Sequence, residues 1–101
     1  MNIELTAEAR KHLRRLGRTL SPAVQVGKSG LTEALVRQVA RALGGRDLVK
    51  IKALDTCGDP IDDVGARLAG ALDAVVVATA GRTALLYRPN PDLTPDKRSL
   101  S

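Results

Sequence analysis

Residues 23–43 read AVQVGKSGLTEALVRQVARAL. The first four residues are typical of a short apolar strand, and from Leu31 onward apolar residues recur with helical spacing. The turn between strand and helix consists of Gly27, Lys28, Ser29 and Gly30. Two glycines around a cation and a hydroxyl, at the start of a helix, let backbone N–H groups approach an anion closely. The stretch therefore predicts a strand–turn–helix unit with a phosphate-binding loop.

Three interpretations of this loop are open. The nucleotide-binding pattern G-x-x-x-x-G-K-[ST] needs a glycine five residues before Gly27, where Pro22 stands, so the nest of N–H groups for a triphosphate is incomplete. The G-x-x-G loop of KH-type modules, which clamps a nucleic-acid backbone, is the second interpretation. The third is a plain turn that uses glycine for its backbone angles. The loop alone does not decide between them.

Charge is distributed unevenly along the chain. Residues 1–52 contain eleven Lys and Arg against four Asp and Glu, a net charge of +7, whereas residues 53–101 contain five against seven, a net charge of −2. The basic half contains the glycine loop. This polarity favours a polyanionic partner, with nucleic acid before an anionic membrane. The alternative is that the cations only solvate helix surfaces.

Length and composition limit the classes of function. A chain of 101 residues is one domain, and its core is aliphatic because Tyr87 is the only aromatic residue. Few aromatic side chains disfavour stacking of splayed bases and favour recognition of backbone and shape. One cysteine, Cys57, and one histidine, His12, exclude an internal disulfide and a Cys/His metal cluster. With neither a signal peptide nor a long apolar run, we expect a cytoplasmic protein without metal or cofactor.

The remaining elements follow from periodicity and from helix-start signals. Thr6 is expected to cap a first helix that ends at Ser21-Pro22, and Asp59 a third helix with Pro60 at its first position. Strands are expected at residues 47–53, 74–78 and 83–88. The predicted order is α-β-α-β-α-β-β, an α/β domain of residues 1–89 in which helices cover one main face of a four-stranded mixed sheet. Residues 90–101, with two prolines and little apolar content, are expected to form a disordered tail.

Asp62 and Asp63 are the acidic pair that could suggest catalysis. Their place in the first turn of the third helix favours a simpler role, because carboxylates there stabilise the positive end of the helix dipole. We therefore name no catalytic residue.

Three blocks of sequence resemble the CRM domain family, and in particular its bacterial single-domain YhbY-type members. They are residues 20–33 around the glycine loop, Asp47-Leu48-Val49-Lys50-Ile51-Lys52, and residues 81–89, GRTALLYRP; the resemblance extends over residues 3–89. It implies a fold similar to the C-terminal domain of translation initiation factor three, with a KH-like glycine loop. It also implies RNA binding and not an enzyme. Bacterial members associate with precursors of the large ribosomal subunit, and plant members assist group II intron splicing.

The resemblance places the RNA-binding loop at Gly27, Lys28, Ser29 and Gly30. Physical inference from charge adds a basic surface, expected to be contiguous with the loop, made of Arg14, Arg15, Arg18, Arg37, Arg41, Lys50 and Lys52. Lys50 and Lys52, which alternate with Val49 and Ile51 along one strand, rank below the arginines because nothing in the sequence ties their face of the sheet to the loop. Arg82 and Arg88 rank below the two lysines. The expected partner is 23S rRNA in large-subunit precursors, bound by a monomer. The alternatives are a protein–protein adaptor in ribosome assembly, which docks through its sheet, and a P-loop-like nucleotide binder.

Overall fold

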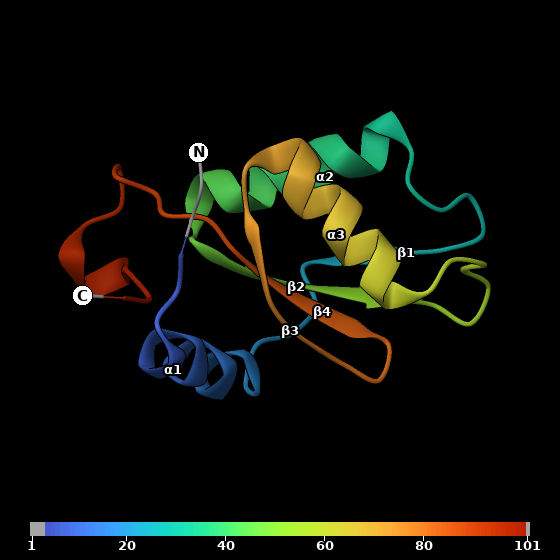
Figure 1. Ribbon diagram of the computed structural model, residues 1–101. Coiled ribbons are helices and arrows are strands. Elements are labelled where there is room, and N and C mark those ends of the chain that lie inside the picture. Colours follow the sequence, from blue (N-terminus) through green and yellow to red (C-terminus); the bar gives the residue numbers. More distant parts are fainter. Residues whose placement is uncertain (1–3, 101) are drawn as a thin grey trace.

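The computed structural model describes residues 4–100, and within them the chain forms three α-helices, four strands and one short 3-10 helix (Figure 1). In chain order these are α1 (Ala7–Gly17), β1 (Val24–Val26), α2 (Glu33–Gly45), β2 (Leu48–Ala53), α3 (Ile61–Leu72), β3 (Val75–Ala80), β4 (Thr83–Tyr87) and η1 (Pro95–Lys97). The predicted order of helices and strands is confirmed up to β4.

The four strands form one mixed sheet in the order β1-β2-β4-β3. β1 pairs with β2 in parallel, with Val24 opposite Ile51, and α2 makes the crossover between them. β4 is antiparallel to both of its neighbours, β2 and β3. The α/β class and the mixed sheet predicted from the sequence are therefore confirmed.

Helices pack on both faces of the sheet, so the expectation of one main covered face is wrong. α2 and α3 lie on one side and α1 on the other (Figure 1). Val49, Ile51 and Leu86 belong to the core cluster under α2 and α3, whereas Leu48 and Leu85 belong to a second cluster with Leu13 of α1. Because β2 and β4 carry large apolar side chains on both faces, each face needs a helix to exclude water.

Arg10 anchors α1 to an irregularity in β3. The β3–β4 register shifts between Val76 and Ala78, and the Arg10 guanidinium donates to the carbonyl of Val76 at 3.0 Å and to that of Val77. A bulge leaves backbone groups without ladder partners, and a charged donor satisfies them well. This arginine therefore has a structural role within the fold.

Three predicted helix ends need correction. α1 ends at Gly17 instead of continuing to Ser21-Pro22. α2 begins at Glu33 instead of Leu31, because the hydroxyl of Thr32 accepts a hydrogen bond from the N–H of Leu35 and so caps the helix. α3 has Pro60 as its N-cap residue, without a side-chain cap, so Asp59 is not the cap.

Residues 90–100 pack against the domain, so the expected disordered tail is wrong for the described part of it. Leu93 is 9% exposed, and Ser99 donates from its backbone N–H to Oδ2 of Asp47 at 2.8 Å and from its hydroxyl to Oδ1. Asn90 donates to the carbonyls of Leu43 and Gly44 at the end of α2. A few long-range contacts hold this segment, although its average composition is polar.

Tyr87 is buried in the cluster below α1, and its pKa is raised above the ordinary 10.0, first by burial and second by the negative charge of Asp47. The folded state therefore holds the phenolic proton more tightly than the unfolded state does. The resulting stability is fully present below about pH 10 and is lost as the pH rises through the raised pKa.

In an alkaline titration followed by tyrosinate absorbance, we expect a midpoint above 10.0 for the native protein. The denatured chain should titrate at the ordinary value, and Tyr87→Phe should unfold at higher pH. Equal titration midpoints for the native and the denatured chain would contradict the buried position of the Tyr87 hydroxyl.

Candidate nucleic-acid interface

The glycine loop is a tight turn with an open outer side. The N–H of Gly30 donates to the carbonyl of Gly27 at 3.0 Å, and Lys28 and Ser29 between them are exposed. Within residues 4–100 the amides of Lys28 and Ser29 donate to no protein acceptor. Two free amides and one ammonium can bind a phosphate oxygen. The turn is too small to surround a triphosphate.

Only one of the two glycines has a backbone conformation that other residues rarely adopt. Gly30 has φ +64°, in the left-handed region, and a Cβ at this position would lie 3.2 Å from Oδ2 of Asp59. A Cβ at Gly27 would make ordinary contacts, 3.6 Å from Oγ1 of Thr56 and 3.7 Å from Leu54. The β2–α3 loop therefore lies directly against the glycine loop. Figure 1 shows both loops and the β3–β4 turn at the same end of the domain, with η1 at the other.

Basic side chains converge on the α1 side of the sheet. Arg14 of α1, Arg18 at the C-cap of α1 and Lys50 of β2 line a hollow of about 430 Å³, which we call the α1 hollow, and no Asp or Glu is among its lining residues. Lys52 lies two residues further along β2 on the same face, roughly 7 Å from Lys50, and is exposed. It pairs with Gln25, two residues before the glycine loop. The α1 hollow is therefore connected to the loop through Lys52.

These cations are available for a ligand. Among the residues that the structure describes, Lys28 and the basic residues of the α1 hollow form no ion pair with a carboxylate. Concave surfaces with charges of one sign concentrate the electrostatic potential. The α1 hollow is thus a stronger attractor for phosphate than the same cations would be on a convex surface.

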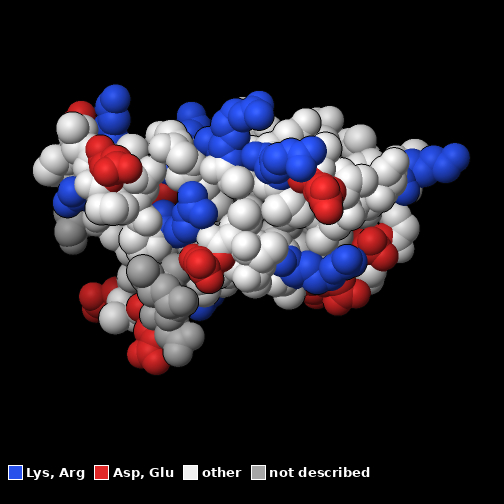
Figure 2. Space-filling view, turned by 90° about the horizontal axis from the view of Figure 1, so that it is seen from above, with Lys and Arg blue, Asp and Glu red and all other residues white. Residues whose placement is uncertain are grey.

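Arg37 and Arg41 lie on α2, in the layer on the opposite side of the sheet from α1. Arg37 is 3.9 Å from the carboxylate of Glu33, and both side chains are exposed. Figure 2 looks onto the α2 and α3 layer and shows Lys and Arg side chains with Asp and Glu side chains among them. The expectation of one contiguous basic surface is therefore wrong, because the sheet separates the arginines of α1 from those of α2.

The other candidates have separate surroundings. Arg15 is exposed and does not line the α1 hollow. Arg88 donates to the carbonyl of Leu72 at the end of α3, and Arg82 pairs with Asp55 beside the β3–β4 turn. In the described part of the chain, no three His, Cys, Asp or Glu side chains are grouped so as to hold a metal ion. No helix within residues 4–100 is long and apolar enough to cross a bilayer.

Comparison with known proteins gives the family. The CRS1 / YhbY (CRM) domain profile matches residues 5–88. This chain belongs to the CRS1 / YhbY (CRM) domain family. It is 33% identical over 88 residues to "Probable RNA-binding protein YqeI" of Bacillus subtilis, covering 87% of this chain and 92% of that protein. It is 32% identical over 87 residues to "Probable RNA-binding protein PA4753" of Pseudomonas aeruginosa, covering 86% of this chain and 84% of the relative.

A solved structure supports the fold of this CRM domain. The solution structure of SAV1595 from Staphylococcus aureus matches with a TM-score of 0.76 and 26% sequence identity, covering 90% of this chain and 95% of the other. The family resemblance read from residues 20–33, 47–52 and 81–89 is therefore confirmed.

Sequence reasoning underestimated the importance of two features of the site. Lys50 is a central member of the α1 hollow, and the alternation of Val49 and Ile51 with Lys50 and Lys52 already indicated a basic sheet face. The contact of the β2–α3 loop with the glycine loop had no sequence signal, because residues far apart in the chain make it.

Proposed function

We propose that this CRM domain binds RNA through its phosphate backbone. The observation that carries the proposal is the α1 hollow, where three cations from two elements converge without a carboxylate and connect through Lys52 to the glycine loop. Most of the affinity would come from release of counterions, and selectivity from the shape of the RNA. The names of the two relatives support RNA as the ligand class.

The proposed RNA contacts differ in how much we expect each to contribute to affinity. The loop residues Gly27, Lys28, Ser29 and Gly30 hold one phosphate group through amides and an ammonium, and the basic residues of the α1 hollow with Lys52 hold the following ones. Arg15, Arg37 and Arg41 stay predicted contacts of the lowest rank, each contributing less than a residue of the loop or the α1 hollow. The resemblance to single-domain bacterial members extends the proposal to 23S rRNA in large-subunit precursors, with the domain acting as a monomeric binder and not as an enzyme.

The adaptor alternative loses support from the fold. An adaptor that docks through its sheet needs an open sheet face, whereas α2 and α3 pack on one face and α1 on the other. Salt dependence separates the two functions, because only direct phosphate contacts make RNA affinity fall steeply with salt. RNA affinity that is insensitive to salt would favour the adaptor.

The glycine loop is tested by Lys28→Glu. We expect the variant to bind unrelated RNA sequences about tenfold more weakly at low salt, and the salt slope to fall by about 0.7 to 0.9, because one phosphate contact is lost. Lys28 is exposed, so the melting temperature should not change. Fluorescence anisotropy over a salt series measures both quantities.

The matched control is Lys97→Glu, which changes the net charge equally at the far end of the domain (Figure 1). This variant should bind RNA within about twofold of the natural chain, since only the long-range potential changes. Equal affinities of Lys28→Glu and the natural chain at low salt would contradict the assignment of the loop.

A further inference from the structure

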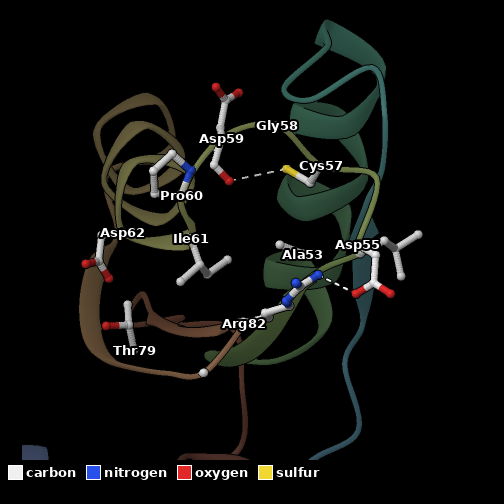
Figure 3. A pocket seen from close by; sticks show the side chains of 12 residues that line it. Ala53, Asp55, Cys57, Gly58, Asp59, Pro60, Ile61, Asp62, Thr79 and Arg82 are labelled. Carbon is white, nitrogen blue, oxygen red and sulfur yellow. Dashed lines mark hydrogen bonds and ion pairs between the residues drawn. The ribbon is translucent and has the colours of Figure 1, made fainter.

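A second cavity lies beside the glycine loop, on the side of the β3–β4 turn (Figure 3). It has a volume of about 590 Å³ and is lined by the β2–α3 loop, the first residues of α3 and the β3–β4 turn. Ala53 and Ile61 give it an apolar part, and its charged residues are Asp55, Asp59, Asp62 and Arg82. We call it the turn cavity. The volume can accommodate a small planar ring system.

The turn cavity lies close enough to the glycine loop for the bases of a bound RNA chain to enter it. Leu54 lines the turn cavity and is also close to Gly27, and Asp59 lines it and is close to Gly30. A ribose-phosphate chain held at the glycine loop therefore has its bases within reach of this cavity. The two sites share one wall, the β2–α3 loop.

The charges of the turn cavity disfavour a phosphate as its ligand. Asp55, Asp59 and Asp62 are among its lining residues, and the only cation among them, Arg82, is already paired with Asp55. Such a site repels an anion, whereas carboxylates accept hydrogen bonds from the amino groups of bases. Figure 3 shows Asp62 and Thr79 on the same side of the turn cavity, and Asp59 with its carboxylate directed away from it.

Arg82 provides a flat surface in a protein that lacks an exposed aromatic residue. Its guanidinium pairs with the carboxylate of Asp55, and the side chains are 59% and 94% exposed. Such an exposed pair contributes little to stability, and it leaves the flat faces of the guanidinium open to a stacking partner. Bases stack on arginine planes as well as on aromatic rings. Tyr87, the only aromatic residue, is buried and cannot stack on a base.

We propose that the turn cavity binds one nucleobase that carries an exocyclic amino group, stacked on Arg82 with Asp62 accepting a hydrogen bond from the amino group. This inference rests on the proposed RNA binding and adds base selectivity to it. Cytosine and uracil are the discriminating pair, because they have the same size and differ at C4, an amino donor against a carbonyl acceptor, and at N3, which carries a proton only in uracil.

Nucleosides test the turn cavity without the phosphate sites. In amide NMR spectra, cytidine should shift the signals of Cys57, Thr79 and Arg82 and leave those of Lys28 and Ser29 in place. Uridine should cause much smaller shifts. Arg82→Ala should abolish the cytidine shifts, Arg82→Lys should weaken them because the charge stays and the plane is lost, and Asp62→Asn should remove the difference between the two nucleosides.

RNA binding gives a second readout. Arg82→Ala should weaken binding of an oligocytidine about tenfold and leave binding of an oligouridine within about twofold, because one stacked base is lost only from the first. Lys28→Glu, in contrast, should weaken both equally. If cytidine shifts no amide of the turn cavity, or uridine shifts them equally, the inference is overturned. Should Lys28→Glu still weaken RNA binding in that case, the proposed backbone binding stands without it.

Discussion

Ending the chain after Pro89 is expected to lower the free energy of unfolding by about 3–5 kcal/mol. The deletion exposes the surface that Leu93 covers, and it removes both hydrogen bonds that Ser99 gives to the carboxylate of Asp47. Asp47 is 3% exposed, so its charge would remain in a poorly solvated position without those donors. Urea unfolding followed by circular dichroism measures the loss.

A substitution of Asp47 separates the destabilisation caused by the buried charge from that caused by the lost apolar contact. In the full-length chain, Asp47→Asn should destabilise the fold, because an amide cannot accept both hydrogen bonds from Ser99 at its two terminal atoms. After deletion of residues 90–101, the same substitution should restore part of the stability, since it removes an unpaired charge. A truncated chain that unfolds at the same urea concentration as the full chain would refute the packed position of residues 90–100.

Reversing the charge of two arginines on α1 is expected to cause the largest loss of RNA affinity. Arg14→Glu combined with Arg18→Glu should weaken binding about 100-fold at moderate salt, because two phosphate contacts are lost and two repulsive charges enter the α1 hollow. Both residues are exposed, so folding should be retained. Anisotropy titration measures affinity, and thermal unfolding verifies the fold.

α2 offers a matched control. Arg37 and Arg41 are also exposed and four residues apart on a helix, so Arg37→Glu combined with Arg41→Glu changes the net charge by the same amount. We expect this variant to lose less than about fivefold in affinity, because these arginines lie on the far side of the sheet and Arg37 faces Glu33. Equal losses for the two pairs would show that net charge matters more than the α1 hollow.

Local patterns were sufficient to predict the elements of this fold. The alternation of Val49 and Ile51 with two lysines predicted a strand, and the two glycines around Lys28 and Ser29 predicted a turn between a strand and a helix. Both features depend on neighbouring residues, so one sequence contains the information. The parallel pairing of β1 with β2 is the arrangement that a strand–helix–strand connection produces.

The side of the sheet on which α1 packs could not be predicted in the same way. The apolar positions Leu13 and Leu16 show that the helix buries one face, and they do not say which face of the sheet receives it. The separation of the arginines on α1 from those on α2 depends on this choice. Leu48, which interrupts the alternation in β2, and the consecutive Leu85 and Leu86 of β4 are the local signs that the second sheet face also needs a cover.

The tail illustrates a second limit of local patterns. Its composition is polar, and the partner of Ser99 is Asp47, 52 residues earlier in the chain. A contact over that separation leaves no periodic signal. The same limit applies to the wall shared by the glycine loop and the turn cavity.

Leu5 and Leu100 pack against the same apolar cluster below α1, so the two ends of the described chain are neighbours, and Figure 1 shows the glycine loop at the opposite pole. Entry and exit points that lie close together let a domain be embedded in a longer polypeptide, or joined head to tail in a series, with short linkers. In such an array every glycine loop would point away from the linkers, so each domain could bind its own ligand.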